Sequence, residues 1–285
     1  MLAANPYAWG FREVDLDVES LKNGVLRFTR ISAIFPNGDF FDAPDADQLP
    51  PPLALRDAIG DEGVGDFYLA LHHINPHGGN CTENASISSQ ARYLIVPRDT
   101  ADLYTDAAEA DITTLSQVAH LKSGSENRDQ FLTLPIARIR RTSSNGFEPD
   151  PAFIPPSASL RSAPLLFMML RRQIDALLAK VEALYGFHRE PTKNVIEFRS
   201  GDIASFWLLH TASSACATLT HLFRHPDTSP ERLFQELLRL AGGLMTFSKG
   251  YSLNDLPGYD HLQPGPCFLR IDQILRDLLL SLIHI

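Results

Sequence analysis

The segment DPAFIPP (residues 150–156) divides the sequence into two parts whose apolar residues follow different periods. Each proline disfavours helix at the residue before it, so the segment predicts a stiff, extended junction. Before the junction, apolar residues alternate with polar ones, as in strands; beyond it they recur every three or four residues, as in helices. We therefore predict an α+β protein with a β-rich domain over 1–156 and a helical domain over 157–285.

Turn residues separate short apolar runs in the first part. Asn23-Gly24 and the segment PNGD (36–39) are typical of tight turns between strands. The predicted strands are VLRFTRISAIF (25–35), FYLALHHI (67–74), RYLIV (92–96), LSQVAHLK (115–122) and FLTLPIARIR (131–140). No long helical pattern occurs among them, so the sequence favours an antiparallel sandwich or barrel over a parallel sheet with crossover helices.

Four helices with short connections are predicted in the second part, which is typical of a four-helix bundle. The first helix is expected to end near Pro191, and a second lies at about 202–221. A third follows the capping segment TSPE (228–231) and carries Leu233, Leu237, Leu240 and Leu244, and a fourth carries Phe268, Ile271, Leu275 and Leu278. The first helix carries one apolar stripe, made of Phe167, Leu170, Ile174, Leu177, Val181 and Leu184. Gly242 and Gly243 lie inside the third helix, where they indicate close packing or the helix end.

The charge of the chain excludes one class of partner. Its 25 Lys and Arg residues against 34 Asp and Glu residues give a net charge of −9. A field of that sign repels phosphate backbones, so we expect no nucleic acid partner. The three cysteines are far apart, which favours a reducing compartment over a disulfide scaffold. No secretory leader is visible and no run approaches the roughly 18 apolar residues of a membrane span, so we predict a cytoplasmic protein without direct membrane insertion.

The best metal candidate is the segment HHINPHGGNC, with His72, His73, His77 and Cys81. Structural zinc sites show tighter, paired spacings. His72 and His73 are neighbours on a predicted strand, so they point to opposite faces and cannot readily share one metal. We therefore predict no metal here.

Two further segments contain residues of the types that carry chemistry. The acidic segment DFFDAPDAD (39–47) lacks the glycine of a calcium loop, so we predict a solvated loop. The segment DLPGYDH (255–261) contains Asp260 beside His261, but no nucleophile motif accompanies this pair, which favours a structural loop. The sequence therefore predicts no catalytic centre, no cofactor and no enzyme activity.

The segment NPYAWGFREVDLD (5–17) places an aromatic cluster before an alternating strand. We expect this cluster to begin the sandwich core or its edge. The alternative is a contact with a partner, because aromatic residues are enriched at interfaces, and a ligand pocket comes third. The candidate partner-binding residues are Tyr7, Trp9 and Phe11.

A second apolar set on the first helix lies off the main stripe: Leu166, Met169 and Leu178. Leaving several such side chains exposed costs about 1.5–3 kcal/mol each, so this set supplies the candidates for an oligomer interface.

Five ordered segments resemble the TssK family of type VI secretion baseplate subunits, also called ImpJ or VasE. They are residues 5–17, FPNGDFFDAPDADQLPPPL (35–53), 131–141, 150–156 and FSKGYSLNDLPGYDH (247–261). The resemblance implies a β-sandwich like the shoulder domain of phage receptor-binding proteins, a helical neck and a C-terminal head. It also implies a homotrimer that holds the wedge proteins TssF and TssG. Through the head it would contact TssL and TssM, at the inner face of the inner membrane.

The chain departs from that family pattern at both ends. A segment usually present before the position of Leu2 is missing, and the chain stops at the fourth predicted helix, so we expect a fragment without the head. Its last residues, LLLSLIHI (278–285), are apolar all round and have no cap, which suggests a truncated gene or a non-native tail. The alternatives are a phage-tail or host-recognition protein and a metal-dependent enzyme on a β-sandwich.

Overall fold

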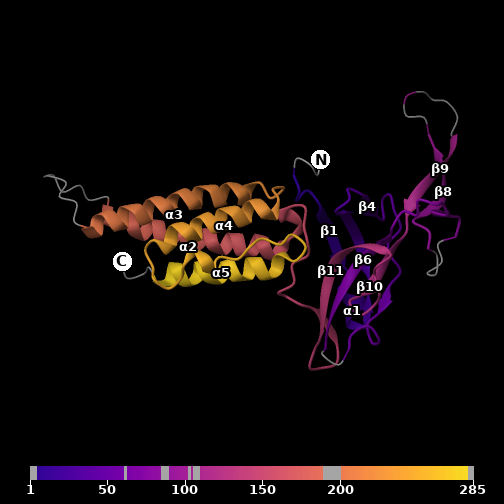
Figure 1. Cartoon of the computed structure of the whole chain (residues 1–285), viewed down its shortest axis with the longest axis horizontal. Coiled ribbons are helices and arrows are strands. Elements are labelled where there is room, and N and C mark those ends of the chain that lie inside the picture. Colours follow the sequence, from indigo (N-terminus) through magenta and orange to yellow (C-terminus); the bar gives the residue numbers. More distant parts are fainter. Residues whose placement is uncertain are drawn as a thin grey trace. The chain divides into compact units, whose positions relative to one another are not determined.

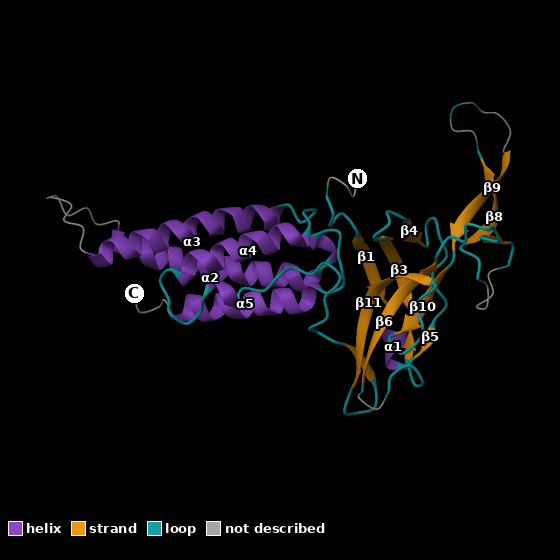
Figure 2. Ribbon diagram, in the orientation of Figure 1, coloured by secondary structure: helices purple, strands orange, loops and turns teal. Residues whose placement is uncertain are grey.

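The computed structural model describes residues 5–60, 63–84, 90–101, 104, 110–188 and 200–281. The chain divides into two compact units, Met1–Pro156 and Ser157–Ile285. The strands lie in the first, here called the β unit, and the long helices lie in the second, here called the helical unit (Figures 1 and 2). The predicted α+β class is therefore confirmed.

The elements of the β unit begin with a strand and include one short helix. In chain order they are β1 (Gly10–Leu16), α1 (Val18–Lys22), β2 (Val25–Leu26), β3 (Phe28–Ile34), β4 (Phe40–Ala43), β5 (Leu53–Ala54), β6 (Val64–His72), β7 (Cys81–Thr82), β8 (Tyr93–Thr100), β9 (Ala110–Gln117), β10 (Ala119–Ser123), β11 (Phe131–Arg141) and β12 (Phe147–Pro149). The predicted strands at 92–96 and 131–140 are thus confirmed as parts of β8 and β11.

Two antiparallel sheets share the core of the β unit. One has the strand order β1-β3-β4 and the other the order β10-β6-β11-β12. Ile31 and Phe41 of the first sheet and Leu69 and Leu134 of the second are fully buried in one apolar cluster. Because side chains alternate across a strand, each sheet contributes one face to this shared core.

Two features of the strands depart from the expected pattern. The predicted strand 115–122 is two strands, because the chain leaves β9 of one sheet at Gln117 and enters β10 of another at Ala119. Val118, between them, donates its backbone N–H to the carbonyl oxygen of Arg92 at 2.9 Å. In the sheet β7-β8-β9, the pair β7–β8 is parallel, so antiparallel pairing does not hold throughout.

The four long helices of the helical unit lie side by side (Figure 1). They are α2 (Pro164–His188), α3 (Ser200–Arg224), α4 (Pro230–Met245) and α5 (Pro264–Ser281), with short 3-10 turns η1 (Leu160–Ser162) and η2 (Leu253–Asp255). Helix α3 packs on α2 and on α4, and α4 packs on α5, whereas α2 and α5 touch only slightly. The seam between α2 and α5 is therefore the most open side of this group of helices.

The predicted apolar stripe of α2 is confirmed. Its residues from Leu170 to Leu184 are buried, with the exposed fraction of each below one tenth. Phe167, at the start of the stripe, is half-buried and stacks on Phe223 of α3, with ring centroids 4.5 Å apart. The predicted stop at Pro191 lies outside the described residues.

Two adjacent glycines in α4 have different surroundings. A Cβ added at Gly243 would lie 2.8 Å from Cγ2 of Thr211 on α3, whereas one at Gly242 would lie 3.8 Å from its nearest neighbour. The hydroxyl of Thr211 donates to the carbonyl oxygen of Trp207 at 2.9 Å, which holds that side chain in place. Gly243 therefore allows α3 and α4 to approach closely, which is one of the two roles predicted for this glycine pair.

We expect Gly242→Ala to stabilise the helical unit and Gly243→Ala to destabilise it. Alanine gains about 1 kcal/mol of helix propensity over glycine at either position, but at 243 its methyl group overlaps Thr211. Thermal unfolding followed by far-ultraviolet circular dichroism measures both variants. Thr211→Ser removes Cγ2 and should restore stability to Gly243→Ala. Equal effects of the two glycine changes would show that the close approach is absent.

Candidate functional site

The aromatic segment before β1 begins the core of the β unit, as predicted. Phe11 is fully buried in the apolar cluster, and Trp9 packs against that cluster while half-buried. The indole N–H of Trp9 donates to the carbonyl oxygen of Pro6 at 2.9 Å. Phe11 also donates its backbone N–H to Pro156 at 2.8 Å, which joins the first strand to the end of the unit. Phe11 thus offers no side-chain surface to a partner, whereas Tyr7 and Trp9 remain half-buried.

Two of the three candidates for an oligomer interface are covered by their own chain. Leu166 is fully buried and Met169 is 4% exposed, whereas Leu178 is 44% exposed. Met169 and Leu178 lie nine positions apart, which places them on opposite sides of a helix with 3.6 residues per turn. Leu166 and Met169 are therefore corrected to core residues, and Leu178 alone of the set presents a surface.

Other apolar side chains on α2 and α3 are exposed and were not singled out from the sequence. They are Met168, Tyr185, Ile203, Phe206 and Trp207. The rings of Phe206 and Trp207 form an edge contact, and Trp207 stacks on His210 with centroids 5.7 Å apart. Two adjacent residues of a helix point in directions about 100° apart, so Phe206 and Trp207 cannot both lie on one narrow buried stripe. Their adjacency in the sequence could therefore have predicted an exposed aromatic side chain here.

The residues weighed for metal binding do not converge. His72 at the end of β6 is buried, whereas His73, His77 and Cys81 are exposed. His72 and His73 therefore face opposite ways, as the strand period predicts. Within the described residues, no three His, Cys, Asp or Glu side chains group in a way that would hold a metal ion.

His72 takes part instead in a buried ring cluster with His120 of β10 and Phe131 of β11. The His72 ring lies 4.2 Å from the Phe131 ring and 5.5 Å from the His120 ring, centroid to centroid. Burial, with the neighbouring His72 and Lys122, lowers the pKa of His120 to about 4. Burial also lowers the pKa of His72. Both rings are thus held neutral between β6, β10 and β11.

We expect the β unit to lose stability as the pH falls from about 6.5 toward 4. In the unfolded chain His120 takes up a proton near its ordinary pKa, whereas the folded protein resists protonation until about pH 4. The contribution of the neutral His120 ring to the free energy of unfolding is therefore complete above pH 6.5. It falls by about 3 kcal/mol as the pH goes from 6.5 to 4. Urea unfolding followed by Trp9 fluorescence in a Trp207→Phe background measures it at several pH values. His120→Leu should flatten the dependence of unfolding free energy on pH, whereas His73→Leu, a change of an exposed histidine, should not. Equal pH dependence in the two variants would show that His120 is not the responsible group.

The acidic segment 39–47 was predicted as a solvated loop, which is only partly correct. Asp47 is buried and accepts the backbone N–H groups of Gln117 at 2.6 Å and Asp42 at 3.0 Å. Burial raises the pKa of the Asp47 carboxyl. Asp39 pairs with the fully buried Arg92 at 2.5 Å. Two of these aspartates therefore fasten the ends of β4 to the β8–β9 hairpin.

The loop before α5 is tied by its own side chains, as predicted. Ser252 and Asp255 bond reciprocally around η2, and the Tyr251 hydroxyl contacts Asp277 of α5 at 2.5 Å. His261 is held by the hydroxyl of Tyr259 at 2.6 Å, so Tyr259 stands where a catalytic pair would require Asp260. This geometry supports a structural role for residues 255–261.

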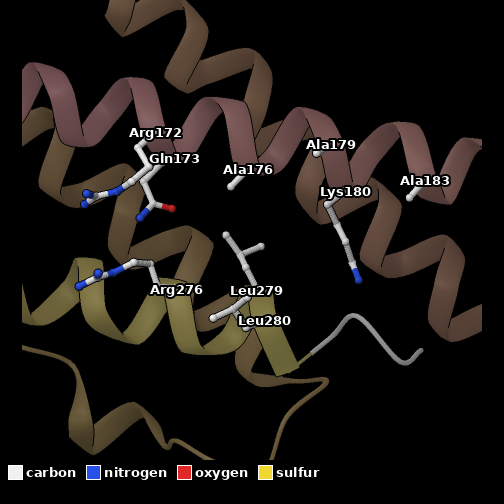
Figure 3. A pocket seen from close by; sticks show the side chains of 9 residues that line it. All are labelled: Arg172, Gln173, Ala176, Ala179, Lys180, Ala183, Arg276, Leu279 and Leu280. Carbon is white, nitrogen blue, oxygen red and sulfur yellow. The ribbon is translucent and has the colours of Figure 1, made fainter.

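A hollow of about 460 Å³ lies in the seam between α2 and α5 (Figure 3). We call it the α2/α5 groove; its walls are Arg172, Gln173, Ala176, Ala179, Lys180 and Ala183 of α2 with Arg276, Leu279 and Leu280 of α5. Three of these residues meet at the buried Asp272, which accepts from Arg172 at 2.7 Å and from the Gln173 amide at 2.8 Å, and pairs with Arg276 at 3.1 Å. The sequence analysis did not identify this groove, because its residues come from two distant segments.

None of the described helices combines the length and the apolar character needed to cross a membrane.

Comparisons with known proteins agree on one family. A curated relative, the type VI secretion system baseplate component TssK1 of Pseudomonas aeruginosa PAO1, is 27% identical over 283 residues. The match covers 96% of this chain and 61% of that relative, so the chain spans about three fifths of its length.

Two solved structures share the fold. A chain of the type VI secretion system TssK–TssF–TssG baseplate subcomplex matches with a TM-score of 0.87 and 29% identity, covering 98% of this chain and 88% of that one. A structure of TssK from "T6SS EAEC", solved with a nanobody, matches with a TM-score of 0.82 and 30% identity, covering 98% of this chain and 93% of that one. A family model matches residues 1–284. The chain therefore belongs to the family described as "Bacterial Type VI secretion, VC_A0110, EvfL, ImpJ, VasE".

Proposed function

We propose that this chain is the wedge-holding part of a type VI secretion baseplate adaptor. The observation that carries the proposal is the match to a chain of a TssK–TssF–TssG subcomplex over 98% of the present chain. The β unit, like the phage shoulder domain, would hold TssF and TssG. In the whole protein a head domain would connect this wedge to TssL and TssM in the cytoplasm, at the inner face of the inner membrane. Relatives named as baseplate components support a structural rather than a catalytic role.

We further propose that Tyr7 and Trp9 contribute to the wedge contact. Both lie just before β1 and are half-buried, so each keeps part of its ring at the surface. Aromatic side chains of this kind give large contact area at low entropic cost and are enriched at interfaces. Phe11 would act only indirectly, by fixing the segment to the core.

A homotrimer is the proposed oligomeric state. Leu178 and the exposed aromatic residues of α3 supply apolar surface that a second copy would cover. Leu178→Glu should therefore weaken association without unfolding the helices. Met169→Glu should unfold them, because that side chain is buried within its own unit.

Co-expression with TssF and TssG from the same bacterium tests the function, and light scattering tests the trimer. We expect the chain to co-elute with TssF and TssG, and the pair Tyr7→Ala and Trp9→Ala to reduce that co-elution. Trp207→Phe, a change in the helical unit, is the control for a changed tryptophan. A folded chain that stays monomeric at micromolar concentration and binds neither wedge protein would overturn the proposal.

A further inference from the structure

Two histidines stand one helical turn apart at the end of α3, in the segment HLFRH (221–225). His221 and His225 are both exposed. His225 follows the last residue of α3, and its backbone N–H donates to the carbonyl oxygen of His221 at 3.0 Å, which continues the helical pattern. Residues four positions apart on a helix are neighbours on its surface, so both side chains lie on one face. Their rings contact each other, with centroids 4.4 Å apart and planes inclined by 42°.

The separation of the two rings fits a shared metal ion. A histidine nitrogen lies about 2.1 Å from a bound metal and the centre of its ring about 1.1 Å beyond it, so each centroid would lie about 3.2 Å from the ion. Two rings bound at a right angle would then have centroids about 4.5 Å apart, and two bound at the tetrahedral angle about 5.2 Å apart. The observed 4.4 Å corresponds to the right angle. The terminal torsion of histidine has a broad minimum, so each ring can turn to direct one nitrogen at a shared ion.

The surroundings of the pair favour a cation that keeps water ligands. The carboxyl end of a helix carries partial negative charge on its last carbonyl oxygens, which stabilises a positive ion there. Because both rings are exposed, an ion can reach them without losing all of its water. Among the residues that the structure describes, no third His, Cys, Asp or Glu side chain joins the pair to complete a metal site. The carboxylate of Asp227 is engaged by Arg161 at 2.7 Å.

We propose that His221 and His225 form a two-ligand site for a divalent transition-metal ion of the Ni²⁺ and Cu²⁺ class. One neutral imidazole nitrogen from each ring binds the ion at adjacent corners of its coordination shell, and water occupies the other positions. Ni²⁺ and Cu²⁺ accept square-planar or tetragonal geometry with such right angles. Zn²⁺ binds more weakly, because its usual tetrahedral geometry needs rings that are farther apart. Ca²⁺ and Mg²⁺ prefer oxygen ligands and do not bind.

A bound ion also stabilises the connection between α3 and α4. The carbonyl oxygen of Thr228 accepts the backbone N–H of Leu160, and that of Pro226 accepts the N–H of Arg161, both at 2.9 Å. These bonds fasten the start of the helical unit to the residues that follow His225. Because the ion binds the helical arrangement of the two rings more tightly than the unfolded chain, it raises the unfolding temperature of this unit.

Isothermal titration of the untagged chain with nickel chloride tests the proposal. We expect saturable binding that His221→Gln and His225→Gln each weaken at least about tenfold, because either change removes one of two ligands. His77→Gln, at another exposed histidine, should leave the affinity unchanged. In the His225→Gln variant, the added change Ala217→His should restore binding, because position 217 is exposed and lies one turn before His221.

Thermal unfolding followed by far-ultraviolet circular dichroism is the second measurement. At a Ni²⁺ concentration about one hundred times the dissociation constant, the unfolding midpoint of the unaltered chain should rise by several degrees. The same concentration of Ca²⁺, or Ni²⁺ with His225→Gln, should leave the midpoint unchanged. Absence of saturable Ni²⁺ binding, an equal loss of affinity with His77→Gln, or a midpoint that Ni²⁺ does not raise would overturn the proposal. Tighter binding of Zn²⁺ than of Ni²⁺ would overturn the right-angle geometry on which it rests.

Discussion

Replacing Arg92 with methionine is expected to lower the free energy of unfolding of the β unit by about 3–5 kcal/mol. The Arg92 side chain is fully buried. Its guanidinium donates to the carbonyl oxygen of His72 at 2.5 Å, to Asp39 at 2.5 Å and to the Gln117 amide oxygen at 3.0 Å. His72 is the last residue of β6, Asp39 comes just before β4, and Gln117 is the last residue of β9. Methionine would fill similar space but would donate to none of the three acceptors, of which Asp39 alone keeps a side-chain donor among the described residues, the amide of Asn37 at 2.6 Å.

Arg98→Met is the matched control. Arg98 lies on β8, the strand that follows Arg92, is exposed, and its guanidinium donates to the Ala46 carbonyl oxygen at 3.2 Å. Its loss should cost less than about 1 kcal/mol. Arg92→Lys should fall between the two, because one ammonium cannot reproduce the planar fork of the guanidinium. Urea unfolding read by Trp9 fluorescence, with Trp207 changed to Phe, follows the β unit alone. Similar losses of unfolding free energy for Arg92→Met and Arg98→Met would disprove the role of Arg92 in joining these strands.

Replacing Asp272 with alanine is expected to destabilise the helical unit by about 3 kcal/mol. The Asp272 side chain is 3% exposed and joins α5 to α2 through Arg172 and Gln173. Without it, the Gln173 amide is left buried with neither end paired. Arg172 keeps access to water, which limits the loss to the lower part of the range for broken buried pairs.

Asp175→Ala provides the comparison for Asp272. The Asp175 carboxylate is exposed and pairs with Arg171 one turn away at 3.2 Å, so its removal should cost less than about 0.5 kcal/mol. Asp272→Asn keeps an acceptor for Gln173 and should cost less than alanine does. Unfolding read by Trp207 fluorescence, with Trp9 changed to Phe, measures the helical unit. A loss for Asp272→Ala no larger than that for Asp175→Ala would mean that α2 and α5 are not joined at this point.

Periodicity predicted the elements well because it depends on neighbours in sequence. The alternation at Leu132, Leu134 and Ile136 belongs to β11, and the stripe from Leu170 to Leu184 is the buried face of α2. The split of 115–122 into β9 and β10 could not be predicted this way. Both strands alternate, and only pairing with different sheets separates them at Val118.

The buried polar contacts could not be predicted from the sequence. A charged residue in a strand or helix is exposed in most proteins, so Arg92 and Asp272 carry no local sign of burial. Their partners are remote: Asp39 lies 53 positions before Arg92, and Arg172 lies 100 positions before Asp272. The α2/α5 groove is built in the same way, from residues brought together only by packing.

The sequence by itself determined the long helices and most of the longer strands, the change of period at 150–156 and the segments that resemble the TssK family, because each depends on residues close together along the chain. The tertiary structure decided which side chains are covered. Leu166 and Met169 are buried and Leu178 is exposed on one helix, since burial depends on which face of α2 meets its neighbours. It also decided that Arg92 and Asp272 are interior and that Oε1 of Gln173 is left without a donor, because the free energy of a polar group is set by its surroundings in space.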